Sequence, residues 1–108
     1  MKKLKKIIVV LIILIIIVPY LYVEINTLIW GNEFENEYKQ TNMISEIEYY
    51  KVFYVIKNKA KVYYVDKGHE GGHYVWFEKE KSDWRMLHWD TVWSEYGSAS
   101  GVTYPFYR

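Results

Sequence analysis

Three residues near the middle of the chain, His69, Glu70 and His73, form the pattern H-E-x-x-H. Zinc proteases use this pattern on a helix, which places both histidines on one face and the glutamate beside the zinc-bound water. Here the two middle positions are glycines, each about 1 kcal/mol less favourable than alanine in a helix. We therefore predict a hairpin loop with solvated histidines, no bound metal and no cofactor. The alternative is a small surface hydrolase or metal-dependent enzyme that uses His69, His73 and His88.

Two other patterns resemble catalytic motifs but lack a required part. The segment Gly97–Gly101 is similar to the nucleophile elbow G-x-S-x-G, yet its central residue is Ala99, which has no hydroxyl. His88, Asp90 and Ser94 lie close together along the chain, but a catalytic triad is defined by geometry and not by closeness in sequence. The sequence therefore predicts no catalytic residue and a protein that is not an enzyme.

Aromatic residues make up 19% of the chain, which argues against disorder. Trp76, Trp84, Trp89 and Trp93 lie within one short stretch. A small domain without cysteine has little else to bury, so we expect most of these rings to form its core. Exposed aromatic planes also bind sugars, peptides and membrane interfaces. We predict Trp89, Trp93 and Tyr104 as the binding residues.

The N-terminal region predicts a membrane anchor. Residues 1–6 form a basic cytoplasmic stub with four lysines, and residues 7–23 contain no charged residue. A helix over 7–23 would span roughly 25 Å, against roughly 30 Å of hydrocarbon, and lysines that snorkel cover the difference. We predict an uncleaved transmembrane helix over 7–23 that contacts the lipid bilayer. The alternatives are a cleaved signal peptide and a buried core helix of a soluble protein.

The small residues of a signal-peptide cleavage site are missing, since the first alanine is Ala60 and the first serine is Ser45. No lysine or arginine occurs between Lys6 and Lys39, so the positive flank is the N-terminus. The positive-inside rule then keeps the N-terminus in the cytoplasm. We predict a single-pass protein of the cell membrane with its C-terminal domain outside.

Residues 24–45 form a juxtamembrane segment for which we predict a short helix over 32–42. Asn32 is a suitable N-cap, and Glu35 stands three residues later, as in a capping box. In the alternative, this segment continues the membrane helix after a bend at Gly31, because one glycine costs a helix only about 1 kcal/mol.

Residues 46–108 read as an aromatic-rich antiparallel β domain with a C-terminal tail. Four segments rich in Tyr, Phe, Val, Ile and Trp are separated by connections too short for crossovers, which predicts a meander. The expected strands are 47–56, 62–65, 73–77 and 84–93. The predicted fold class is α+β, with the short helix packed on a four-stranded sheet. The alternative is a small all-β half-barrel.

The expected strands do not alternate cleanly between apolar and polar residues. Pairs such as Tyr49-Tyr50 and Tyr63-Tyr64 put aromatic rings on both faces of the sheet. A sheet with one wet face alternates, so we infer that both faces are at least partly covered. The short helix would cover one face, and the C-terminal tail, the bilayer surface or a partner would cover the other.

Composition and charge narrow the range of possible functions. The formal net charge is +1, which argues against nucleic acid as a partner, and the chain has no cysteine for disulfides, thiolate metal sites or nucleophiles. We predict a non-enzymatic binding or accessory module anchored at the outer face of the membrane. Its partner would be another membrane protein, a cell-wall polymer or a toxin that it neutralises, because the anchor raises their effective concentration.

Overall fold

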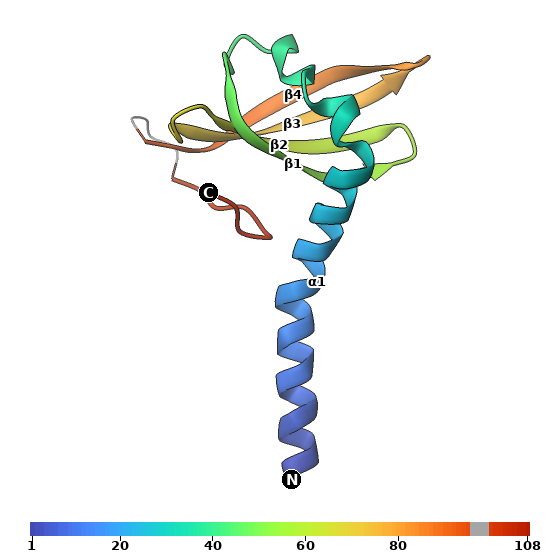
Figure 1. The fold of residues 1–108 in the computed structure, drawn as a ribbon, viewed down its shortest axis with the longest axis vertical. Coiled ribbons are helices and arrows are strands. Elements are labelled where there is room, and N and C mark those ends of the chain that lie inside the picture. Colours follow the sequence, from blue (N-terminus) through green and yellow to red (C-terminus); the bar gives the residue numbers. More distant parts are fainter. Residues whose placement is uncertain (96–99) are drawn as a thin grey trace.

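The structure is a computed structural model that describes residues 1–95 and 100–108. The described residues contain one long helix and a four-stranded sheet, with a single turn of 3-10 helix between them (Figure 1). The elements are α1 (Lys2–Phe34), η1 (Glu37–Gln40), β1 (Ile47–Ile56), β2 (Lys59–Asp66), β3 (Gly71–Glu80) and β4 (Asp83–Ser94). The first part of α1 projects away from the sheet as a stalk, and the C-terminal tail returns beside it.

The helix α1 is long and apolar enough to cross a membrane. A signal sequence near an N-terminus meets the same criterion of length and composition, and so does the core helix of a soluble protein. The side chains of residues 7–18 are all about half exposed, so the protein itself does not bury this stretch. Below, residues 7–23 are called the apolar run.

The end of α1 corrects one prediction. No separate helix over 32–42 exists in the described residues, because α1 continues through Gly31 to Phe34, as the alternative expected. Packing explains the continuation: Val23 and Phe34 are buried in the domain. Gly31 leaves room for a tyrosine of the sheet, since a Cβ there would lie 2.8 Å from the hydroxyl oxygen of Tyr50.

The sheet confirms the predicted meander. Its strands follow the order β1-β2-β3-β4, and each neighbouring pair is antiparallel. The last three strands are longer than predicted because their pairing includes flanking charged residues, such as Lys59 opposite Glu78. Backbone irregularities interrupt the register of β1 between Val52 and Tyr54, and the pairing of β3 with β4 between Gly72 and His73.

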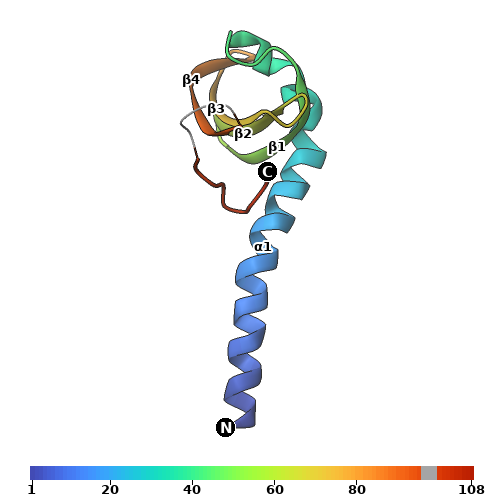
Figure 2. The same cartoon turned by 90° about the vertical axis from the view of Figure 1, so that its left-hand side faces the viewer.

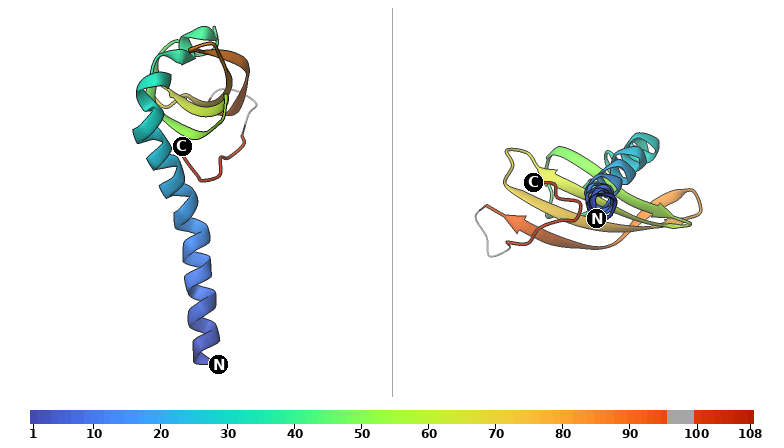
Figure 3. Two further views of the ribbon diagram at one scale, coloured as in Figure 1. Left: turned by 90° about the vertical axis from the view of Figure 1, so that its right-hand side faces the viewer. Right: turned by 90° about the horizontal axis from the view of Figure 1, so that it is seen from below.

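Both faces of the sheet are at least partly covered, and each carries a core of buried side chains. The neighbours Tyr63 and Tyr64 point to opposite faces, and each is fully buried. The sheet is strongly curved, and the end of α1 and η1 close its concave side (Figures 2 and 3). The concave core contains Phe34, Tyr38, Ile44, Val52, Ala60, Val62, Tyr64, Val75, Phe77 and Trp84. The opposite core contains Val23, Phe53, Tyr63, Val65 and Trp93, with Tyr107 of the tail packed against it.

Hydrogen bonds attach α1 to the exposed edge of β1. The hydroxyl of Thr27 accepts the backbone N–H of Val52 at 2.9 Å, and the amide of Asn26 donates to the carbonyl of Phe53 at 3.3 Å. An edge strand otherwise presents unpaired backbone groups to solvent. Because α1 supplies these partners and contributes to both cores, the helix and the sheet form one packed unit, and the all-β alternative does not describe this chain.

Candidate functional site

The structure gives each of the three histidines its own neighbours. His69 lies in the turn between β2 and β3, where its ring nitrogen is 3.2 Å from the carboxylate of Glu48. His88 stacks on Trp76 with ring centroids 4.3 Å apart. His73 lies in β3. No group of three or more His, Cys, Asp or Glu residues able to hold a metal ion occurs among residues 1–95 and 100–108.

The prediction of two solvated histidines is wrong for His73, because β3 already begins at Gly71. The ring of His73 is only 5% exposed and lies between two side chains of neighbouring strands. Its Nε2 is 2.9 Å from a carboxylate oxygen of Asp66, and its Nδ1 is 2.9 Å from the hydroxyl of Thr91. The three side chains resemble an acid–base–hydroxyl set, but burial of the ring leaves little access to solvent. Their evident effect is to connect β2, β3 and β4.

The other two motifs do not form a site in the described residues. His88, Asp90 and Ser94 all lie on β4, and no hydrogen bond joins them in this part of the chain. The segment Gly97–Gly101 falls largely outside the described residues, which omit 96–99.

The predicted binding residues Trp89, Trp93 and Tyr104 do not form one surface. Trp93 is 2% exposed, and its indole donates a hydrogen bond to the hydroxyl of Tyr63, so it belongs to the core. Trp89 is 37% exposed on the outer strand β4. Tyr104 is 56% exposed and lies against α1, where its hydroxyl donates to the carbonyl of Ile15 at 2.8 Å.

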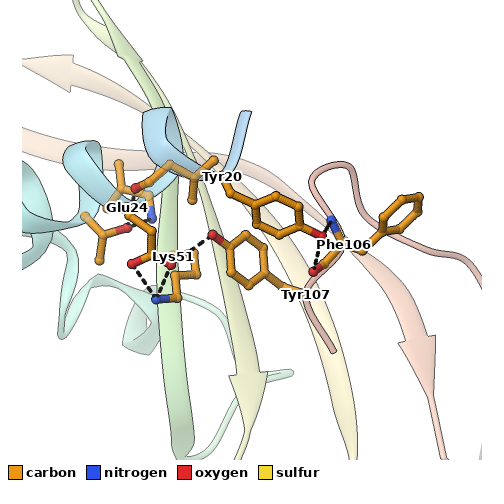
Figure 4. A network of polar contacts seen from close by, with 8 residues as sticks. Tyr20, Glu24, Lys51, Phe106 and Tyr107 are labelled. Carbon is orange, nitrogen blue, oxygen red and sulfur yellow. Dashed lines mark hydrogen bonds and ion pairs between the residues drawn. The ribbon is translucent and has the colours of Figure 1, made fainter. Parts of the chain in front are cut away.

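A polar network joins α1, β1 and the tail at the C-terminal end of the apolar run (Figure 4). Lys51 of β1 forms an ion pair with Glu24 at 2.8 Å, and the hydroxyl of Tyr107 donates to the same carboxylate at 2.9 Å. The hydroxyl of Tyr20 donates to the carbonyl of Phe106 at 2.9 Å and accepts its N–H at 2.8 Å. This network, called the tail latch below, holds the end of the chain on the helix.

The tail latch depends on the charge of Glu24. The hydrogen bond from Lys51 lowers the pKa of this carboxyl below its ordinary value of 4.5; burial opposes the shift, and the hydrogen bond from Tyr107 adds to it. The pKa of Tyr107 is raised, first by burial and then by the adjacent carboxylate. At neutral pH the phenol is therefore the donor and the carboxylate the acceptor.

An open cleft of about 480 Å³ lies between the end of α1 and the start of β1. Its lining combines tyrosine rings with two carboxylates and few aliphatic side chains. The lining residues are Thr27, Glu35, Asn36, Tyr38, Ile47, Glu48, Tyr49 and Tyr50. Burial raises the pKa of Tyr49 to about 12, so its phenol stays neutral in the physiological range. We call this hollow the α1–β1 cleft.

Sequence reasoning did not find the α1–β1 cleft or the tail latch. Both depend on contacts between distant segments, such as Glu24 with Tyr107, for which periodicity and motifs carry no signal. Comparisons with known proteins add no further guide, because no family model, no curated protein and no solved structure matches the chain. The chemistry of the described residues is therefore the basis for assigning a function.

Proposed function

We propose that the protein is a single-pass membrane protein whose domain lies outside the cell and acts as a non-enzymatic binding module. In this proposal, the α1–β1 cleft binds an extended, basic segment of a neighbouring membrane protein. The observation that carries the proposal is the continuity of α1, which runs without a break from the apolar run to the wall of the cleft.

The packing of α1 supports an uncleaved anchor. A signal peptide is cleaved just after its apolar core, which here ends at Val23. Cleavage in that region would remove Val23 from the core, and it would threaten the contacts of Asn26 and Thr27 with β1. An uncleaved helix keeps these contacts, and the lysines of residues 1–6 favour a cytoplasmic N-terminus.

The position of the cleft supports a membrane-bound partner. Thr27 follows Val23 by four residues, which places the near wall of the cleft about 6 Å beyond the apolar run. Glu35 lies about 18 Å beyond it by the same helical rise. A segment that emerges from a neighbouring membrane protein lies at a similar distance from the bilayer. Its effective concentration at the cleft is therefore high.

The chemistry of the cleft supports an extended and basic ligand. The strand β1 is at the edge of the sheet, and α1 bonds its backbone at Val52 and Phe53. Residues 47–50 of the same strand line the cleft, where a peptide in extended form can add alongside them. The carboxylates of Glu35 and Glu48 at the rim favour lysine or arginine side chains on that peptide.

Photocrosslinking in living cells tests the proposal. A photoreactive phenylalanine analogue is placed at Asn36, which lines the cleft, and in a matched control at Ile56, which is 56% exposed at the far end of β1. We expect a membrane protein to crosslink to the Asn36 position and not to the Ile56 position. Equal crosslinking at both positions, no crosslinking at Asn36, or a polysaccharide adduct there would contradict the proposed ligand.

The hydrolase that uses His69, His73 and His88 stays the alternative function. No contact among the described residues favours it, since the three rings have separate neighbours. The double substitution His69→Gln and His88→Gln discriminates the two functions, because both rings are at the surface of the sheet. Crosslinking at Asn36 is expected to persist in this variant, whereas a metal-dependent enzyme would lose its function.

A further inference from the structure

We propose that the C-terminal segment Val102–Phe106 is a second membrane-contact segment, which lies in the outer leaflet against α1 and completes the hydrogen bonding of that helix at Pro19. The inference rests on the proposed anchor, because it requires the apolar run to be in a bilayer. It adds a part of the chain, far from the anchor in sequence, that lipid would surround.

Pro19 leaves one carbonyl of α1 without its usual hydrogen-bond donor. Proline has no backbone N–H, so the carbonyl of Ile15, four residues earlier, loses its usual donor. In water a solvent molecule replaces that donor, but in hydrocarbon each backbone polar group must find a partner within the protein. The hydroxyl of Tyr104 donates to the carbonyl of Ile15 at 2.8 Å. The tail thus supplies the partner that Pro19 removes.

This contact fixes the depth of the segment. Ile15 precedes Val23 by eight residues, which corresponds to about 12 Å along the helix axis. When the apolar run spans the bilayer, the hydroxyl of Tyr104 is therefore below the headgroups and among the acyl chains. Tyr104 closes an apolar groove on the helix, whose other walls are Leu11, Leu14, Ile15, Val18 and Pro19.

The side chains of the segment suit lipid. Val102, Tyr104 and Phe106 are 68%, 56% and 59% exposed in the isolated protein, beside helix residues that are similarly exposed. Residues 100–107 contain no charged side chain. The exposed apolar surface of the helix thus continues onto the tail. In this proposal, the acyl chains of the outer leaflet cover both surfaces.

Part of the backbone of the segment has hydrogen-bond partners within the protein. Non-helical backbone is tolerated at membrane depth only where it is buried in protein or lines a water-filled cavity, and the alternate residues Thr103 and Pro105 are buried against the protein. The N–H and the carbonyl of Phe106 both bond to the hydroxyl of Tyr20. The hydroxyl of Thr103, which is buried, donates to the carbonyl of Pro105 at 2.7 Å and accepts the N–H of Tyr107 at 2.8 Å.

Fluorescence quenching in vesicles measures the depth directly. The chain has no cysteine, so single-cysteine variants of the full chain accept one environment-sensitive fluorophore each. The probe position is Val102→Cys; Ile12→Cys in the apolar run is the positive control, and Met43→Cys beyond η1 is the negative control. The proteins are reconstituted in vesicles of phosphatidylcholine and phosphatidylglycerol that carry spin-labelled acyl chains.

We expect severalfold stronger quenching at Val102→Cys and Ile12→Cys than at Met43→Cys. Quenching at Val102→Cys no stronger than at Met43→Cys, with Ile12→Cys quenched, would overturn the second membrane contact and leave the anchor intact. If Ile12→Cys is not quenched either, the anchor itself is wrong and the inference falls with it.

A pair of substitutions tests the hydrogen bond. Tyr104→Phe keeps the ring and removes the donor to the Ile15 carbonyl, so quenching at Val102→Cys is expected to fall severalfold. Pro19→Ala restores a helical N–H to that carbonyl, so adding Tyr104→Phe in this background is expected to change quenching little. An equal effect of Tyr104→Phe in both backgrounds would contradict the role assigned to Pro19.

Discussion

At the residue scale, single side chains have effects that their sequence motifs do not predict. The histidines of the H-E-x-x-H pattern are separated because β3 begins inside the pattern, which buries His73 and leaves His69 at the surface. Trp93, one of the predicted binding residues, is buried in the core that also contains Tyr63. Two residues that no motif analysis selected as functional, Gly72 and Glu24, allow sharper tests.

Gly72 is required by close packing. A Cβ at this position would collide with the indole nitrogen of Trp93 and the hydroxyl of Tyr63, which bond to each other. We expect Gly72→Ala to lower the free energy of unfolding by about 1–3 kcal/mol, the usual cost of overpacking a core. The measurement is chemical denaturation of the full chain in detergent micelles.

The control for Gly72→Ala is Gly68→Asn. Gly68 has a positive φ of 82°, a region that asparagine tolerates, and no backbone atom lies near its absent side chain. Its free energy of unfolding should stay within about 0.5 kcal/mol of the unchanged protein. Equal losses in both variants would show that the contact with Trp93 is not the cause.

Glu24 makes the tail latch sensitive to acid. Since its pKa is lowered in the folded protein, the charged carboxylate stabilises the latch above pH 4.5, the ordinary value. That stabilisation is lost as the pH falls through the lowered pKa of Glu24. We expect acidification below pH 4.5 to increase proteolytic cleavage of the tail, measured by mass spectrometry after brief exposure to pepsin.

Two variants separate this effect from general acid unfolding. Glu24→Gln should cleave readily at every acidic pH, because the charge is already absent. Glu78→Gln removes a carboxylate from a surface pair with Lys59 and should keep the original pH dependence. A pH profile of Glu24→Gln that matches the unchanged protein would exclude Glu24 as the titrating group.

At the element scale, sequence patterns predicted the strands far better than the helix. Polar or glycine-containing turns separate four β-rich segments, so local chemistry is sufficient for the antiparallel order. The end of α1 is decided by tertiary contacts instead. The capping signal at Asn32 is overridden because Phe34 packs into the concave core, and Gly31 makes space for Tyr50. Local sequence patterns did not predict the α1–β1 cleft either, because the cleft follows from this extension of α1.

Thr27 tests how α1 holds the edge of the sheet. Its hydroxyl accepts the N–H of Val52, and Thr27→Val keeps the shape but leaves that donor without a partner. We expect a loss of about 1–3 kcal/mol in the free energy of unfolding, the usual cost of an unsatisfied buried donor. Hydrogen exchange at the Val52 amide should become faster, which nuclear magnetic resonance of the labelled protein in micelles measures.

Thr27→Ser is the matched control, because it retains the hydroxyl and removes only a methyl group. Its Val52 amide should stay protected. Fast exchange in Thr27→Ser as well would mean that packing by the methyl group, and not the hydrogen bond, protects the strand.

At the scale of the whole molecule, α1 connects the apolar run, both cores and the C-terminal tail. Its first part is apolar and exposed, its end contributes to both cores, and its middle bonds to the C-terminal tail through Tyr20 and Ile15. The sequence predicted the apolar run from charge and length alone. The return of the tail joins residues more than 80 positions apart, which no local pattern encodes.

The most direct test of the membrane-anchored domain is the accessibility of single cysteines in living cells. Lys3→Cys and Met43→Cys are treated with a membrane-impermeant maleimide before and after permeabilisation, and the membrane fraction is analysed. We predict that Met43→Cys reacts in intact cells, and that Lys3→Cys reacts only after permeabilisation, in a protein of the same length. An unreactive Met43→Cys in intact cells, or a shortened domain released into the medium without the Lys3→Cys position, would contradict the account.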